Sequence, residues 1–192
     1  MFSTFLDSVT AVAAVGGFVL ALIGVVRRRS KTRVEYRWEL TDEYADVPFL
    51  LDPRNFENSL RAGATRLFPG RDDIYAEKAQ VRLVVRVSRQ GGSPTSVEYV
   101  ELGDPVRQAA LIRQPGQIGV AVRTIDPNSH AEWVFCFAEA ARALQFAYPN
   151  GDFPDLVIRV AIGGGRKHPF AKAPKLPATQ IRSLMAAITG NR

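Results

Sequence analysis

The segment VRLVVRVSRQGGSPTSVEYVEL, residues 81–102, contains two alternating runs separated by a turn signal. In the first run, the odd positions from Val81 to Val87 are apolar, and most of the even positions are polar. Alternation with a period of two is typical of a strand that buries one face. The turn signal is GGSP at residues 91–94, and SVEYVEL at residues 96–102 follows it as a second alternating run. We therefore expect a β-hairpin at this point.

The same pattern extends to both sides of this segment. RVEYRWEL, residues 33–40, alternates strictly, and DLVIRVAI, residues 155–162, is rich in β-branched residues. Further strands are predicted over residues 117–123, 131–137 and 166–170. Asp126, Pro127, Asn128 and Ser129 form the turn signal between two of these runs.

Three segments have helical spacing instead. Residues 55–67 predict a short helix, and residues 137–147 predict a second one that interrupts the strands. After an extended Pro/Lys linker at residues 171–177, apolar residues at Ile181, Leu184 and Ile188 predict a C-terminal amphipathic helix within residues 178–192. This last helix is expected to dock either on the domain or on a partner.

The order of strands and turns between residues 79 and 170 resembles immunoglobulin-like sandwiches of small single-pass bacterial membrane proteins, which are mostly uncharacterised. The resemblance implies a mainly β fold: an antiparallel immunoglobulin-like sandwich with one short inserted helix. It rests on the pattern of the runs VRLVVRVSRQGGSPTSVEYVEL, IDPNSHAEWVF and DLVIRVAIGGGRKHPF. The chain departs from antibody-type domains because Cys136 is its single cysteine, so the paired cysteines are missing.

The apolar run VTAVAAVGGFVLALIGVV, residues 9–26, predicts an N-terminal transmembrane helix. Residues 1–8 form a leader that contains Asp7 and no Lys or Arg, unlike a cleaved signal peptide, whose charges precede the apolar run. The basic segment 27–33 follows the run, so the positive-inside rule predicts a single-pass protein of the inner (plasma) membrane with a cytoplasmic β-rich domain, residues 34–170. A signal peptide with unusual flanks, or an apolar helix inside an assembly, remains an alternative.

Two sets of residues are expected to make contacts in or at the bilayer. Basic side chains near anionic headgroups attract them, and small residues on one helix face allow two membrane helices to approach closely. A homodimer through the membrane helix is therefore compatible with the sequence. The expected lipid-headgroup contacts are Arg27, Arg28, Arg29, Lys31 and Arg33, and the expected helix–helix contacts are Ala13, Gly17, Ala21 and Gly24.

The net charge of +6 is concentrated at the two ends of the chain. Five of the 25 basic residues lie within residues 27–33, and seven more lie after Ile158, so the body between them holds more acidic than basic residues. A nucleic-acid-binding domain carries its positive charge on the folded surface. The distribution therefore favours membrane lipid over nucleic acid as a partner.

The sequence contains no recognisable catalytic, metal or cofactor motif. His130, His168 and Cys136 are not at metal-ligand spacing, and we interpret them as loop imidazoles and a structural thiol. GGGR at residues 163–166 lacks the Lys-Ser/Thr of a phosphate loop, so it is interpreted as a turn. The acidic side chains of Asp72, Asp73 and Glu77 are interpreted as a solvated loop, and both tryptophans, Trp38 and Trp133, as core residues.

The leading hypothesis is therefore a membrane-anchored, non-enzymatic interaction domain that presents loops of a β-sandwich to a protein partner. One alternative is a membrane-tethered enzyme or ligand-responsive effector with a pocket near residues 41–79. A second alternative is a structural subunit of a membrane assembly or virion.

Overall fold

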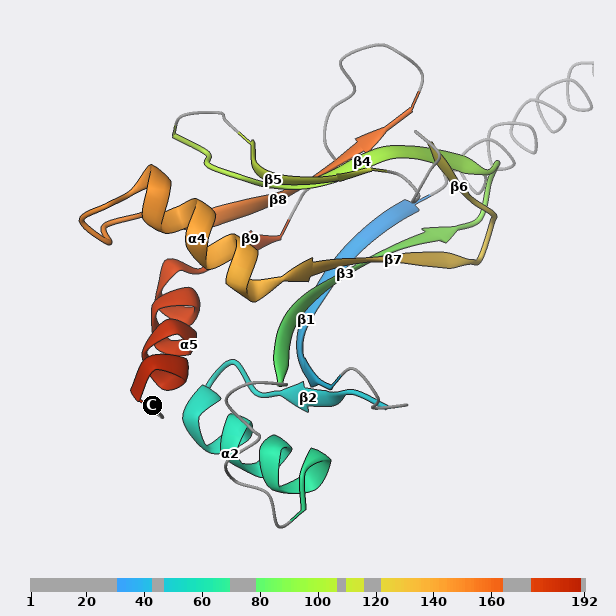
Figure 1. Ribbon diagram of the computed structural model, residues 1–192. Coiled ribbons are helices and arrows are strands. Elements are labelled where there is room, and N and C mark those ends of the chain that lie inside the picture. The colour runs from blue at the N-terminus through green and yellow to red at the C-terminus, as the bar shows by residue number, and fades with distance from the viewer. Residues whose placement is uncertain are drawn as a thin grey trace, which may run out of the picture.

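The computed structural model of the chain describes residues 31–42, 47–69, 79–106, 110–115, 122–163 and 174–190 (Figure 1). Alternating stretches form strands and stretches with helical spacing form helices, as expected from their periodicity. The strands are β1 (Lys31–Thr41), β2 (Phe49–Leu51), β3 (Gln80–Gln90), β4 (Thr95–Gly103), β5 (Ala110–Pro115), β6 (Arg123–Ile125), β7 (His130–Cys136), β8 (Leu156–Ile162) and β9 (Lys175–Leu176). The helices are α2 (Phe56–Leu67), α4 (Phe137–Ala147) and α5 (Ala178–Gly190).

The strands form two antiparallel sheets, so the prediction of a mainly β fold is confirmed. Sheet A has the order β2-β1-β3-β7, and sheet B has the order β5-β4-β8-β9, with β6 also paired to β4. The apolar side chains of both inner faces belong to one hydrophobic cluster. In β3, for example, Val85 and Val87 are fully buried, and in β8 the same is true of Ile158 and Val160.

The predicted hairpin is wrong, although both of its strands exist. β3 pairs with β1 and β7 in sheet A, whereas β4 pairs with β5, β6 and β8 in sheet B. The turn at residues 91–94, with Gly91 and Gly92 at positive φ, therefore carries the chain from one sheet to the other. Alternation alone could not show this, because a strand buries one face equally well whichever strand it pairs with.

A second turn crosses between the sheets beside the first. Residues 126–129 connect β6 in sheet B to β7 in sheet A. The backbone N–H of Gly91 donates to Asn128 Oδ1 at 3.1 Å, and the N–H of Arg89 donates to the carbonyl of Ser129 at 2.9 Å. The two crossing turns thus stabilise each other at the end of the molecule where β1 begins. We call them the paired arches.

Other predicted boundaries also change. Of the strand predicted at 117–123, only the last two residues are described, and Arg123 begins β6; residues 116–121 lie outside the described part of the chain. β5 was not predicted from the sequence. The predicted linker contains β9, which pairs with β8, so its end belongs to sheet B. The predicted strand at 166–170 also lies outside the described residues.

All three predicted helices are present and lie toward one end of the molecule (Figure 1). The side chain of Asn55 caps α2 by accepting from the N–H of Asn58 at 3.3 Å. α5 docks on the domain, since Ile181 and Leu184 are buried in the common core. Its first N–H, from Ala178, donates to Asp155 Oδ1 at 2.9 Å.

No helix among the described residues is long and apolar enough to cross a membrane. The predicted leader at 1–8 and transmembrane helix at 9–26 lie outside the described residues, as do positions 27–30 of the basic segment.

Candidate functional site

The structure describes only two of the residues predicted to contact the bilayer. Lys31 and Arg33 are exposed at the start of β1, and Arg33 Nη2 lies 2.7 Å from Glu35 Oε1. The other predicted lipid contacts (Arg27, Arg28, Arg29) and the predicted helix–helix contacts (Ala13, Gly17, Ala21, Gly24) lie outside the described residues. The side chains of Lys31 and Arg33 thus lie on the outer face of sheet A.

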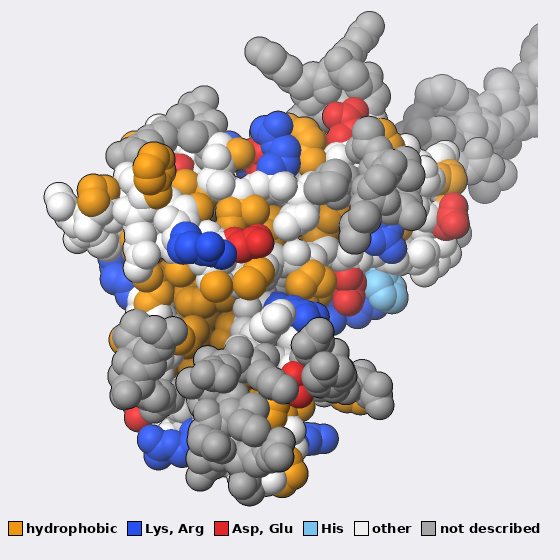
Figure 2. All heavy atoms as spheres, in the orientation of Figure 1, with side chains coloured by type: hydrophobic (Ala, Val, Ile, Leu, Met, Phe, Trp, Pro, Cys, Tyr) orange, Lys and Arg blue, Asp and Glu red, His pale blue; other side chains and the backbone are white. Residues whose placement is uncertain are grey.

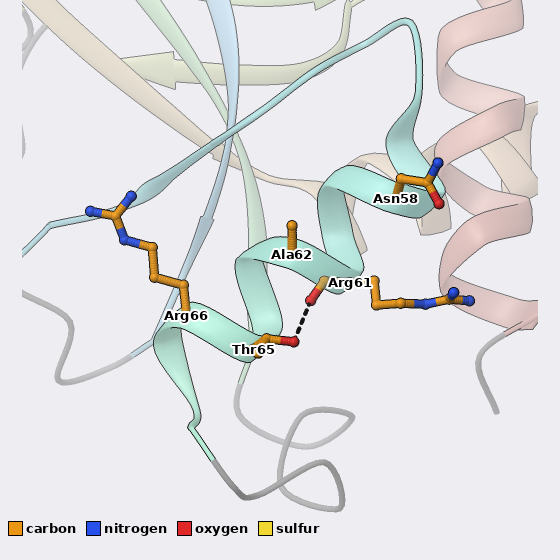
Figure 3. A pocket seen from close by; sticks show the side chains of 5 residues that line it. All are labelled: Asn58, Arg61, Ala62, Thr65 and Arg66. Carbon is orange, nitrogen blue, oxygen red and sulfur yellow. Dashed lines mark hydrogen bonds between the residues drawn. The ribbon is translucent and has the colours of Figure 1, made fainter.

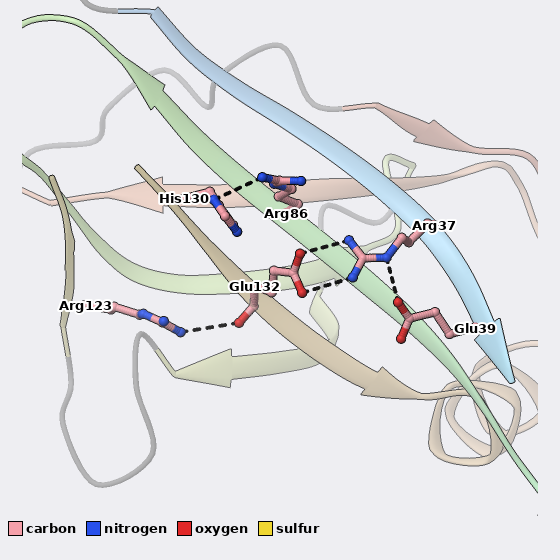
Figure 4. Close-up of polar contacts among 6 residues, drawn as sticks. All are labelled: Arg37, Glu39, Arg86, Arg123, His130 and Glu132. Atoms are coloured by element: carbon pink, nitrogen blue, oxygen red, sulfur yellow. Dashed lines mark hydrogen bonds and ion pairs between the residues drawn. The ribbon is translucent and has the colours of Figure 1, made fainter. Parts of the chain in front are cut away.

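That outer face carries a set of charged side chains that the sequence analysis did not bring together (Figure 4). Register places odd-numbered residues of β1 and even-numbered residues of β3 and β7 on the same face. Arg123 reaches the set from β6 and donates to the carbonyl of Glu132 at 3.4 Å. We call the set the sheet A polar cluster; its members are Arg37, Glu39, Arg86, Arg123, His130 and Glu132.

Arg37 is the centre of this cluster. Its Nη1 and Nη2 donate to the two carboxylate oxygens of Glu132 at 2.9 and 3.0 Å, and its Nε donates to Glu39 Oε1 at 2.6 Å. Arg37 is on β1 and Glu132 is on β7, so the guanidinium bridges the intervening strand β3. The β3 residue opposite Arg37, Val84, is only 2% exposed. The arginine is therefore held in one orientation by a two-pronged contact.

The pKa values follow from this geometry. Hydrogen bonding to Arg37 is the largest cause that lowers the pKa of Glu132 below its ordinary value of 4.5, and it outweighs the opposing effect of burial. The bond to Glu132 is likewise the largest cause that raises the pKa of Arg37. Both side chains are thus charged at neutral pH, and each stabilises the charge of the other.

Arg86 and His130 form the second contact of the cluster. Arg86 Nη2 lies 3.0 Å from His130 Nδ1. Because a guanidinium only donates, Nδ1 must accept, and the neutral ring then carries its proton on Nε2. His130 is exposed, as expected, but it begins a strand and does not lie in a loop. Figure 2 shows acidic and basic side chains interspersed with hydrophobic ones on the visible face of the molecule.

A second charged network lies on the outer face of sheet B, and its carboxylates, Glu101 and Asp104, are buried. Glu101 is bonded by Arg113 Nη2 at 3.0 Å and by Arg159 Nη1 at 3.3 Å, and Arg159 Nη2 also donates to the carbonyl of Asp104 at 3.2 Å. The carboxylate of Asp104 accepts from the hydroxyl of Tyr148 and from the N–H of Val106. Each carboxylate has charged or polar partners, so this network joins β4, β5, β8 and the end of α4.

Within the described part of residues 41–79, where the alternative hypothesis places a pocket, a shallow hollow of about 540 Å³ lies along α2 (Figure 3). Its lining comes from one helix face: Asn58, Arg61, Ala62, Thr65 and Arg66. Arg61 and Arg66 point in opposite directions, and the hydroxyl of Thr65 bonds to the carbonyl of Arg61. A ligand site needs polar groups that converge. The described side chains of this hollow do not provide them.

Within the described ranges, no group of three or more His, Cys, Asp and Glu side chains could hold a metal ion. Cys136 is half-buried immediately before α4, and Trp38 and Trp133 are buried, as predicted. The other predicted loop and turn residues lie outside the described part of the chain: Asp72, Asp73, Glu77, Gly164, Gly165, Arg166 and His168.

Comparison with known proteins identifies no family. No protein family matches the chain, and no curated protein matches it. Among solved structures, a match is the "X-ray structure of Northeast Structural Genomics Consortium target SoR45", at 13% identity and a TM-score of 0.32. The alignment covers 76% of this chain and 85% of the other. The function must therefore be argued from the surface of the molecule itself.

Proposed function

We propose that this chain is a membrane-anchored, non-enzymatic interaction protein with an immunoglobulin-like β-sandwich that binds a protein partner. The observation that carries the proposal is the outer face of sheet A, where arginines are held in fixed positions on a rigid surface. Arg37 is fixed by two carboxylates, and Arg86 is fixed by His130. Surface arginine is enriched at protein interfaces and is a frequent contributor to binding energy.

Preorganisation is the physical advantage of this surface. Immobilising a long side chain at an interface costs on the order of 1 kcal/mol of conformational entropy. Arg37 incurs that cost on folding, because its three hydrogen bonds already define its position. Binding of a partner to the same guanidinium therefore costs less conformational entropy, and the affinity is higher.

Exposed apolar side chains lie at both sides of the polar cluster. Val134 on β7 is 46% exposed, and Leu50 on β2 is 61% exposed. By register, Leu50 lies beside Glu39 and Val134 lies beside Val84, both on the outer face. A surface that combines fixed arginines with apolar side chains at its margins offers a partner both specificity and area to bury.

The predicted anchor would set the orientation of this surface. Because β1 begins at Lys31, the paired arches lie at the end of the sandwich that would face the headgroups, as Lys31 is opposite Gln90 in register. In a single copy of the chain, the arches are then the loops nearest the membrane, and the sheet A polar cluster extends away from it. Lys31 and Arg33 would remain available to anionic lipid.

Quantitative co-purification from native membranes tests the proposal. Val134→Asp and Arg86→Glu alter the proposed surface, and Arg61→Glu, on the exposed face of α2, is the matched control for the loss of an exposed arginine. We expect proteins that co-purify with the natural chain and with Arg61→Glu to be depleted from both surface variants. An identical set of co-purifying proteins for all four chains would remove the basis for this surface.

A further inference from the structure

Among the described strands, none pairs with one edge of β1 along most of its length. β2 pairs only with Trp38, Glu39 and Leu40, and β3 occupies the opposite edge. Within the described residues, no strand pairs with the free edge of β1 over residues 31–37. An unpaired strand edge presents a row of backbone donors and acceptors that can pair with another strand.

We propose that this edge pairs with the same edge of a second copy of the chain, so that the two sheets A become one continuous sheet. The free stretch has seven residues, and its middle residue is Val34. A two-fold axis at Val34 pairs the seven residues with the seven of the other copy in antiparallel orientation. A symmetric dimer of this kind uses the same surface on both subunits.

The charges on the outer face fit this register. With Val34 opposite its own copy, Arg33 is opposite Glu35 of the second copy, and Glu35 is opposite Arg33 of the second copy. Directly opposed charges of opposite sign stabilise a pair of strands. Arg33 and Glu35 also contact each other within one chain at 2.7 Å, yet their side chains are 67% and 45% exposed. Both therefore remain accessible to the second copy.

The outermost pairs of this register place Lys31 opposite Arg37 of the second copy. Two like charges would normally oppose such pairing. Here the charge of Arg37 is compensated by Glu39 and Glu132, at 2.6 and 2.9 Å. On the inner face, Thr32 is opposite Tyr36 of the second copy, and the two Val34 side chains meet at the axis.

The surroundings of the β1 and β7 edges of sheet A differ, and they favour the β1 edge for pairing with a second copy. At β7, Arg123 lies across the edge, donating to the carbonyl of Glu132 and placing its guanidinium 5.5 Å from the centre of the Trp133 ring. Beside β1, a hollow of about 460 Å³ lies over the outer face of β1 and β3, lined by Glu35, Tyr36, Arg37, Val84, Arg86 and Pro174. Among the described residues, Arg123 thus lies across the β7 edge, whereas no strand pairs with the β1 edge over residues 31–37.

Disulfide trapping of the full-length chain in detergent tests both the dimer and its register. In a Cys136→Ser background, Val34→Cys places the two thiols opposite each other, where facing Cα atoms are about 4.5–5.5 Å apart, within disulfide range. Thr32→Cys is the matched control, because its two copies would lie about 14 Å apart along the paired strands. We expect the Val34→Cys chain to cross-link at least about tenfold faster, because Cα atoms more than about 7 Å apart cannot be bridged.

A charge exchange in the same background tests the proposed pairs. Arg33→Glu and Glu35→Arg each place like charges opposite each other, and we expect each to weaken dimerisation about tenfold, since two cross-strand pairs become repulsive. The double exchange restores opposite charges and should restore cross-linking. The proposal is overturned if Thr32→Cys cross-links as fast as Val34→Cys, or if the double exchange does not recover. It is also overturned if Gly17→Ile abolishes the dimer while the charge variants leave it unchanged, since the contact would then be between membrane helices.

Discussion

The indole of Trp38 is buried among aromatic rings, and its Nε1–H has no hydrogen-bond partner among the residues that the structure describes. The rings of Phe56 and Phe137 meet it edge-on, with centroids 5.9 and 5.7 Å away. An unsatisfied buried donor costs about 1–3 kcal/mol, which offsets part of the gain from burying the ring. Trp133 is similarly buried, but the guanidinium of Arg123 lies over its ring. The two tryptophans should therefore respond differently to the same substitution.

We predict that Trp38→Phe destabilises the protein less than Trp133→Phe does, by about 1 kcal/mol or more. The first change removes an unsatisfied donor, and the second weakens a cation–π contact worth about 0.5–1 kcal/mol. Urea unfolding of each purified variant, followed by circular dichroism, measures the difference. Equal losses of unfolding free energy would show that the orphaned N–H of Trp38 has no energetic weight.

The lowered pKa of Glu132 predicts how the stability of the fold depends on pH. Its folded-state pKa is lowered by Arg37, so on acidification the unfolded state takes up a proton first. The stabilisation is therefore complete above the unfolded pKa and is lost as the pH falls through the lower folded pKa. We expect Glu132→Gln to lower the melting temperature at neutral pH and to flatten its dependence on pH between about pH 5 and pH 3. Glu57→Gln is the control, because Glu57 forms an exposed ion pair with Arg61 on α2. If the melting temperature of Glu132→Gln depended on pH in the same way as that of the natural chain, the assignment would be contradicted.

These residues also show what the sequence could and could not predict at this scale. The burial of both tryptophans followed from their phase in an alternating strand. The contact of Arg37 with Glu132 did not, because the two residues are 95 positions apart and meet only when β3 lies between their strands. Each charge pattern was visible in its own strand, but the order of strands in the sheet was not.

Among the elements, α2 contains a glycine that packs where no side chain fits. A Cβ atom on Gly63 would lie 2.7 Å from Phe49 Cδ1 and 3.0 Å from Leu40 Cδ2. Alanine at a helix interior is normally favoured over glycine by about 1 kcal/mol. Here the close approach of α2 to β1 and β2 should reverse that preference, because both ring and methyl would have to move.

We therefore predict that Gly63→Ala lowers stability, by about 1 kcal/mol or more, the range of overpacked sites. Thr65→Ala, on the exposed face of the same helix, raises helix propensity without meeting the core and should leave stability equal or slightly higher. Thermal unfolding of the two variants provides the comparison. If Gly63→Ala were stabilising, the contact between α2 and the strands would be looser than the structure indicates.

The strands themselves could be predicted from the sequence, but their pairing could not. Periodicity identified β1, β3, β4, β7 and β8, because each buries alternate side chains against the core. Periodicity did not predict which strands pair with each other, since GGSP between two alternating runs is equally compatible with a hairpin and with a crossing between sheets. The deciding contact is the bond from Gly91 to Asn128, which joins two turns far apart in the sequence.

For the whole molecule, the predicted anchor and the described domain combine into one testable orientation. The paired arches lie beside the start of β1, and α2 lies near its other end, beyond β2 (Figure 1). A strand of this length spans at most about 34 Å. If the chain enters the bilayer through residues 9–26, Ser93 in the first arch should lie nearer the headgroups than Asn58 on α2.

We predict that a fluorophore at Ser93 is quenched more strongly than one at Asn58 when the full-length chain, kept monomeric by Arg33→Glu, is placed in vesicles with nitroxide-labelled headgroups. Both sites are exposed, and Cys136→Ser removes the natural thiol, so Ser93→Cys and Asn58→Cys differ mainly in position. Equal quenching would indicate a domain that lies flat on the membrane, and stronger quenching at Asn58 would reverse the orientation. Two anchors in one membrane require the two-fold axis of the edge-paired β1 dimer to lie along the membrane normal, and this axis is perpendicular to sheet A. Without Arg33→Glu, the dimer should therefore lie flat and the two labels should be quenched about equally, which separates it from the upright single chain.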